Sequence, residues 1–80
     1  MDRNDIVEFL IASVAQVYRV DPATLSEDTN LPEEMGIKSM QQLALCGLIE
    51  NETDVVFSIG DFGKYPTIGA IADYIDEKMI

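Results

Sequence analysis

Apolar side chains recur at helical spacing in three separate segments of this 80-residue chain, and this periodicity constrains the fold more than any other feature. Residues 67–79 show it most clearly, residues 4–20 carry one broad apolar stripe, and residues 40–52 carry two. Val55–Phe57 has a strand-like composition, but the sequence offers no second strand with which it could pair. The chain is therefore predicted to be all-α, a small bundle of three main helices with a short extra helical turn near residues 59–62.

Capping residues and prolines indicate where these helices begin and end. Asn4 or Asp5 could cap the first helix, and Thr67 is well placed to cap the last one. The first helix should end before Asp21-Pro22, because a residue that precedes proline avoids the helical conformation.

A long irregular segment is predicted at residues 21–38, between the first two helices. Pro32 and Gly36 argue against a continuous helix there. Leu25 and Leu31 are spaced as anchors that would pin this segment to the bundle. In the loop after the second helix, the apolar residues Phe57, Ile59 and Phe62 are predicted to cover the core.

Size and charge exclude several classes of function. Eighty residues are too few for two independent cores, so residues 1–80 are predicted to form a single domain. The net charge of −10 would repel nucleic acids and anionic membranes and attract basic protein surfaces, although acidity also simply keeps small proteins soluble. The sequence shows no signal peptide and no apolar run of transmembrane length. We therefore expect a cytoplasmic monomer that binds neither nucleic acid nor membrane.

Residues that could support catalysis or metal binding are scarce. The chain has no histidine to act as a general base near neutral pH. Its single cysteine, Cys46, lies among apolar residues inside a helix, where a thiol packs more often than it reacts. One cysteine and no histidine cannot build a His/Cys metal site, and the sequence has no phosphate-binding loop and no dinucleotide-binding glycine motif. The chain is predicted to hold no metal and not to be an enzyme.

The stretch with the most specific chemical content is Gly36-Ile37-Lys38-Ser39-Met40. It places a serine where an irregular segment meets a helix, beside backbone N–H groups and a positive dipole end that favour a phosphate. Ser39 and Gln42 could form a capping box, which is a purely structural role. A phosphodiester on Ser39 would instead meet those N–H groups and the Lys38 ammonium. These residues alone leave both roles open.

The helix that follows, residues 40–52, is apolar on two sides. One side, the Leu45 stripe, comprises Leu45, Cys46, Leu48 and Ile49; the other, the Met40 stripe, comprises Met40, Leu43, Ala44 and Gly47. A helix that is apolar all round is either fully buried or uses one side for something else, and full burial is hard to arrange in so small a protein. One stripe is therefore predicted to be available to a partner.

The order of these motifs resembles that of acyl and peptidyl carrier proteins over essentially the whole chain. The matching segments are Tyr18–Pro22, Asp28–Leu31, Met35–Met40 and Pro66–Ile75. The resemblance implies the acyl-carrier-protein fold, no catalysis by the chain itself, and a 4'-phosphopantetheine arm on Ser39. A phosphopantetheinyl transferase would move the arm from coenzyme A, and cargo would then travel as a thioester between acyl-processing enzymes. It also implies that Leu45, Cys46 and Ile49 face the bundle and that the Met40 stripe faces those partners.

Two features depart from the usual pattern of that family. Lys38 stands where acyl carriers commonly have an acidic residue, and Gln41 and Ala44 stand where acidic residues are common in the helix. We interpret these departures as a sign of apolar partner contacts and of a specialised pathway rather than general fatty-acid synthesis. Fatty-acid, polyketide and aminoacyl cargoes all stay open. The alternative interpretation is a carrier-like docking or regulatory module that is never modified.

Overall fold

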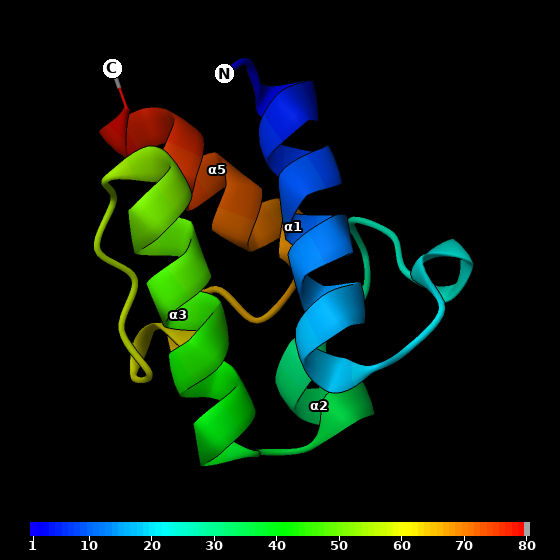
Figure 1. Ribbon diagram of the computed structural model, residues 1–80. Coiled ribbons are helices and arrows are strands. Elements are labelled where there is room, and N and C mark those ends of the chain that lie inside the picture. The colour runs from blue at the N-terminus through cyan, green and yellow to red at the C-terminus, as the bar shows by residue number, and fades with distance from the viewer. Residues whose placement is uncertain (80) are drawn as a thin grey trace.

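The computed structural model describes residues 1–79, and within them the chain folds into a helical bundle (Figure 1). In chain order, the helices are α1 (Arg3–Tyr18), a 3-10 turn (Pro22–Thr24), α2 (Leu31–Met35), α3 (Ser39–Thr53), α4 (Asp61–Lys64) and α5 (Ile68–Lys78). The long helix α1 packs against both α3 and α5. In the described part of the chain, β-structure amounts to one isolated bridge between Asn30 and Thr67. The predicted all-α fold with three main helices is confirmed.

The core lies where α1, α3 and α5 meet. Its fully buried side chains include Ile6, Leu10 and Val14 of α1, Leu45 and Ile49 of α3, and Ile68, Ile71 and Ile75 of α5. These positions recur at the helical period, which is why the sequence pattern located them. Removing each of these side chains from water contributes about 1.5–3 kcal/mol, which offsets the entropy lost on folding.

The start of α1 differs from the prediction. Its N-cap is Asp2, not Asn4 or Asp5: Asp2 Oδ1 accepts a hydrogen bond from the Asp5 N–H at 2.9 Å. Asp5 Oδ2 accepts in return from the Asp2 N–H at 3.2 Å. This reciprocal pair is a capping box, so Asp5 is the partner of the cap rather than the cap itself. The helix ends at Tyr18, and Arg19 closes it in the left-handed conformation with φ of 58°.

The segment before α3 is more regular than predicted, because it contains the 3-10 turn and α2. Pro32 does not prevent α2, since it lies in the first helical turn, where a missing N–H leaves no helical hydrogen bond unmade. Asn30 caps α2 by accepting a hydrogen bond at Oδ1 from the Glu33 N–H at 2.9 Å. The two leucines predicted as anchors, Leu25 and Leu31, are both buried, as expected.

Backbone hydrogen bonds fasten the segment before α2 to the start of α5. They run from Leu31 N to Pro66 O (2.8 Å), from Ile68 N to Thr29 O (3.1 Å) and from Gly69 N to Glu27 O (2.9 Å). Thr67 caps α5 as predicted, accepting a hydrogen bond from the Ala70 N–H at 3.0 Å. Because α2 leads directly into the turn before α3, these bonds also position the start of α3.

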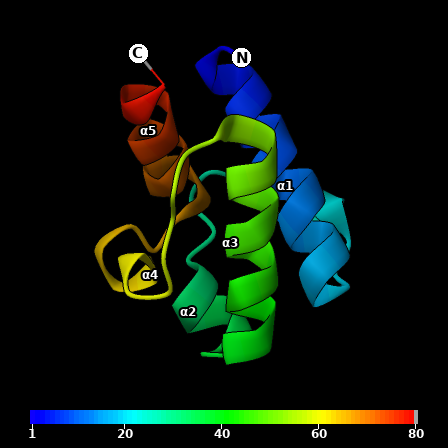
Figure 2. The same ribbon diagram turned by 60° about the vertical axis from the view of Figure 1, so that its left-hand side comes forward.

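The loop after α3 runs back along the bundle and carries α4, which lies beside α2 and α3 (Figure 2). The predicted extra helical turn is present, but at Asp61–Lys64 rather than near residues 59–62. Phe57 and Phe62 are buried over the core as predicted. Ile59 is 39% exposed, so the prediction that it covers the core was wrong.

Arg3 ties the start of α1 to the loop before α2 and to α5. Its Nη2 lies 2.7 Å from Glu27 Oε1, and its Nε lies 2.6 Å from Asp73 Oδ1. The hydrogen bond from Arg3 lowers the pKa of Glu27 below the ordinary value of 4.5. A carboxylate with a lowered pKa contributes stability above its unfolded-state pKa and loses that contribution as the pH falls through its folded-state pKa.

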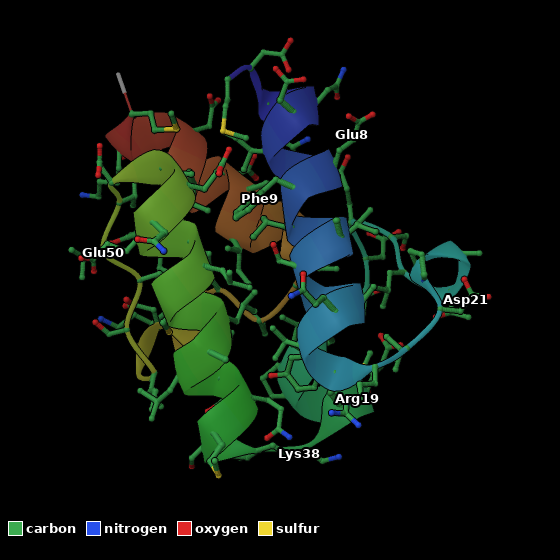
Figure 3. The ribbon with its side chains drawn as sticks, viewed as in Figure 1. Glu8, Phe9, Arg19, Asp21, Lys38 and Glu50 are labelled. Atoms are coloured by element: carbon green, nitrogen blue, oxygen red, sulfur yellow. The ribbon has the colours of Figure 1, made fainter. Side chains whose placement is uncertain are left out.

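The Glu27→Gln variant is therefore expected to be less stable than the wild type at neutral pH. The difference in the free energy of unfolding should shrink as the pH falls below about 4.5. Denaturant unfolding from neutral into acid pH measures it. Glu8→Gln is the matched control, since Glu8 is exposed on α1 (Figure 3) and takes no part in the ion pairs of residues 1–79, which join Arg3 to Glu27 and Asp73. A pH-independent deficit in Glu27→Gln would contradict the expectation.

Candidate functional site

The chain enters α3 through a turn at Gly36. This residue has φ of 76° and ψ of 173°, a conformation that is open almost only to glycine. Lys38 is extended and forms the N-cap of α3, and Ser39 is the first helical residue. The second main helix, predicted at residues 40–52, thus begins at Ser39 and ends at Thr53.

Gly36→Ala is expected to destabilise the protein by about 1–3 kcal/mol, because the backbone conformation is strained for any residue with a Cβ. An added Cβ would have no atom within 4 Å, so the loss of stability would come from backbone strain and not from steric crowding. Gly47→Ala is the matched control: the space is open there too, but Gly47 is helical, and alanine should stabilise α3 by about 0.5–1 kcal/mol. Chemical denaturation compares the two, and effects of the same sign would contradict the prediction.

Ser39 does not cap α3, so the predicted capping box with Gln42 is not formed. Such a box needs Ser39 at the N-cap, but Lys38 occupies that position and provides no side-chain acceptor. The N–H groups at the start of α3 therefore lack a side-chain cap. Ser39 itself is exposed. Its hydroxyl is accessible at a helix N-terminus whose donors have no side-chain acceptor.

The charges around Ser39 suit a phosphate. The first turn of α3 carries no acidic residue, although the whole chain has a net charge of −10. Figure 3 shows Lys38 and Arg19 at the same end of the molecule, the end at which α3 begins. Together with the helix N-terminus, they favour an anionic group on Ser39.

The two stripes of α3 face opposite ways. Leu45 and Ile49 are fully buried and Cys46 packs against the core, so the implied orientation of these residues is confirmed. The whole Met40 stripe faces solvent, with Met40 81% and Leu43 58% exposed. Met40 and other side chains of α3 also form one side of a shallow, open pocket of about 220 Å³. Its lining residues are Val17, Met40, Gln41 and Ala44.

Gln42, which the sequence suggested as a capping partner of Ser39, is buried, and its burial was not predicted. Its side chain is buried, with 3% exposed, and its Oε1 has no hydrogen-bond partner within residues 1–79. Leaving a buried acceptor unpaired costs about 1–3 kcal/mol, so such groups are rare in folded proteins. The spacing held a usable signal: Gln42 precedes Leu45 by three positions and Ile49 by seven, which places it on the buried side of α3.

Gln42 lines a second pocket, of about 270 Å³, at the junction of α2, α3 and α4. The other lining residues are Pro32, Ile37, Ile59, Gly60, Phe62 and Gly63. We call it the Gln42 pocket. Its walls are apolar apart from Gln42 itself. Ser39 lies one helical turn before Gln42, and side chains at this spacing are neighbours on a helix surface.

Other reactive groups are few. Burial, with a smaller contribution from the charge of Asp61, raises the pKa of the Cys46 thiol. The thiol therefore stays protonated at neutral pH and is a poor nucleophile. Residues 1–79 contain no group of three or more histidine, cysteine or acidic side chains that could hold a metal ion. No helix among the described residues combines the length and apolar character needed to cross a membrane.

Comparison with known proteins identifies the family to which the chain belongs. The model of the phosphopantetheine attachment site family matches residues 8–75. The chain belongs to this family. Its members bear covalently attached 4'-phosphopantetheine and act as carriers rather than as catalysts. The exposed serine, the uncapped helix start and the lack of nearby acids in α3 all fit such a carrier.

Two carrier proteins illustrate the relationship. The chain is 26% identical over 77 residues to an acyl carrier protein of Thermotoga maritima, a match that covers 96% of this chain and 95% of that one. Its fold is similar to the crystal structure of a free-standing peptidyl carrier protein from an uncharacterized Acinetobacter baumannii secondary metabolic pathway. The TM-score is 0.88 at 26% identity, covering 99% of this chain and 98% of the other. The predicted resemblance to acyl and peptidyl carriers is confirmed.

Proposed function

We propose that Ser39 bears the 4'-phosphopantetheine arm and that the protein shuttles thioester-bound acyl or aminoacyl intermediates between enzymes. The observation that carries this proposal is the exposed Ser39 at the uncapped N-terminus of α3. Loading would form a bond between Ser39 Oγ and phosphorus while the pyrophosphate of coenzyme A is cleaved, releasing adenosine 3',5'-bisphosphate and the hydroxyl proton. The N–H groups of α3 and the Lys38 ammonium would stabilise the resulting phosphodiester.

The Met40 stripe is the proposed docking surface for the phosphopantetheinyl transferase and for acyl-processing enzymes. Large apolar side chains rarely stay exposed together on a small protein unless they bind a partner. Met40 and Leu43 are both exposed and lie one and four positions after Ser39 on α3. The net charge of −10 would speed encounter with basic partner surfaces. In this proposal, the arm supplies the thiol that holds the cargo, and the chain itself is not an enzyme.

We place this carrier in a specialised pathway rather than in general fatty-acid synthesis. Support comes from Lys38, which replaces the acidic residue common in acyl carriers, and from the similar peptidyl carrier of a secondary metabolic pathway. A fatty-acyl, polyketide or aminoacyl cargo fits equally well. The protein is proposed to act as a monomeric single domain over residues 1–80 in the cytoplasm, where the lone Cys46 thiol would stay reduced.

Intact-protein mass spectrometry after incubation with coenzyme A and a broad-specificity phosphopantetheinyl transferase tests the attachment site. The wild type is expected to gain one phosphopantetheinyl group, and Ser39→Ala is expected to gain none. Ser58→Ala is the matched control, because Ser58 is also exposed but lies in the loop before α4. Loading of Ser39→Ala, or failure of Ser58→Ala to load, would overturn the assignment of Ser39.

A second candidate function is an unmodified docking or regulatory module, which Lys38 and the exposed Met40 stripe favour. If the wild type gains no mass, Lys38→Asp separates the two candidates. Rescue of loading would show that Lys38 blocks the general transferase and that a dedicated enzyme is needed. Continued failure would favour the docking module.

A further inference from the structure

A shallow groove between α1 and α3 offers a partner an apolar surface. It is the open pocket of about 220 Å³ lined by Val17 of α1 and by Met40, Gln41 and Ala44 of α3. A cavity of about 150 Å³ already accepts a benzene molecule, so the groove has room for one large apolar side chain of a partner. The shared lining also shows that the end of α1 lies against the first turns of α3.

Two basic residues flank this groove. Arg19 follows Val17 by two positions, Lys38 precedes Met40 by two, and both side chains are exposed. The ion pairs of residues 1–79 all involve Arg3, so neither Arg19 nor Lys38 is neutralised by a carboxylate within this part of the chain. Both charges are therefore available to a molecule that occupies the groove.

The many acidic residues of the chain lie outside the groove. None of its lining residues is acidic, and neither is any residue in the first turn of α3. Figure 3 shows Glu8 and Glu50 away from the end at which α3 begins. Of the acids on α2, Glu34 accepts a hydrogen bond from the Asn30 N–H at 2.8 Å. The charge next to the groove is thus opposite in sign to the net charge of −10.

We propose that the partners of this carrier dock on the groove with an apolar side chain flanked by carboxylates, which pair with Arg19 and Lys38. The proposal rests on the proposed function and deepens it by naming the charge of the partner surface. Salt screens exposed charges beyond about 8 Å at physiological ionic strength. The net charge therefore affects the approach of a partner, whereas the two nearby cations and the positive end of α3 act at contact.

This arrangement would also exclude partners with basic docking surfaces. A partner that places lysine or arginine beside the groove would bring like charges against Arg19 and Lys38, which disfavours the complex. A partner with carboxylates there would instead gain charge-assisted hydrogen bonds, and the planar guanidinium of Arg19 can form two with one carboxylate. The two cations are thus specificity-determining residues for partner choice.

A pair of short helical peptides tests the proposal on the wild-type chain. Both carry the same leucine stripe, which is flanked by glutamates in one peptide and by lysines in the other. With 15N-labelled protein in low salt, the glutamate peptide is expected to shift the amide resonances of Met40, Gln41 and Ala44. Its affinity for this site should be at least about threefold higher than that of the lysine peptide, and added salt should lower it. Equal or weaker binding of the glutamate peptide at these amides, or binding that salt leaves unchanged, would overturn the proposal.

Charge reversal separates the two cations from the net charge. Lys38→Glu and Arg19→Glu should each weaken binding of the glutamate peptide at the groove by at least about 2–5-fold, since each loses one exposed ion pair. Lys78→Glu is the matched control, because it changes the net charge equally but lies exposed in the last turn of α5. An equal loss of affinity in Lys78→Glu would assign the effect to net charge and overturn the proposal.

Arg19→Gly removes a cation without a risk to the fold. Arg19 has φ of 58°, a conformation that glycine adopts with less strain, so this variant should be at least as stable as the wild type. It should nevertheless bind the glutamate peptide about 2–5-fold more weakly at the groove. Unchanged affinity would overturn the role of Arg19. All peptide measurements use the chain without its arm. Failure to gain the arm by mass spectrometry therefore counts against the proposed function, whereas a loaded chain that prefers the lysine peptide at the groove counts against this docking surface.

Discussion

Met40→Glu is expected to lower kcat/KM for transfer of the arm to the protein by about 10–100-fold, with the fold intact. Met40 is 81% exposed at the start of α3, beside the proposed attachment residue, so a glutamate there would cost little in the free protein. In the complex with the transferase, the new carboxylate would have to lose its water shell against an apolar partner surface. A loss of this size corresponds to about 1.4–2.8 kcal/mol, the range typical of a central interface residue.

Steady-state kinetics of arm transfer, with far-ultraviolet circular dichroism of each variant, measures this effect. Leu43→Glu should behave like Met40→Glu, since Leu43 lies one turn further along the same exposed stripe. Val56→Glu is the matched control, because Val56 is 61% exposed but lies in the loop after α3. An equal loss of activity in Val56→Glu would show that added negative charge, and not the Met40 stripe, is responsible. Unfolding of Met40→Glu would contradict the assigned orientation of α3.

Most of the fold could be predicted from the sequence because the apolar residues that form its core recur at the helical period. The buried positions of α1 and α5 recur every three to four residues, and this spacing places Ile6, Leu10 and Ile71 on one side of their helices. Short elements were harder to predict. The helix α2 has five residues, including Pro32, and no such segment is stable by itself. It forms because tertiary contacts hold it, among them the hydrogen bond from the Leu31 N–H to Pro66 O.

The site was predictable in part, for a related physical reason. Local sequence located Ser39 at the start of a helix and correctly separated the exposed and buried stripes of α3. Local sequence predicted the wrong N-cap. Whether Lys38 or Ser39 is the N-cap depends on the backbone conformation of the turn at Gly36, which local sequence does not specify. Local sequence also took Gln42 for a capping partner. A search for apolar repeats does not detect a polar residue on the buried side of a helix. The spacing of three positions between Gln42 and Leu45 nevertheless places Gln42 on that side of α3.

Phe62→Ala is expected to cost about 3–5 kcal/mol of stability, which is the usual effect of removing a buried aromatic ring. Phe62 is 2% exposed, and its ring meets that of Phe57 edge to face, with centroids 5.0 Å apart. Four residues are too few to form a stable helix on their own, so α4 depends on tertiary contacts such as this one. A single small core supplies only roughly 3–5 kcal/mol of net stability in a domain of 80 residues, so the variant should be largely unfolded at room temperature.

Thermal and urea unfolding followed by circular dichroism measures this loss, and Phe9→Ala serves as the control. Phe9 packs at the margin of the core on α1 and is only partly buried (Figure 3), so its loss should cost clearly less. A folded, fully stable Phe62→Ala would show that α4 is not held by its aromatic contact. Phe62 also lines the Gln42 pocket. The same side chain therefore affects both the stability of α4 and the volume of the pocket near Ser39. Any natural enlargement of this pocket would therefore require compensating stability elsewhere in the bundle.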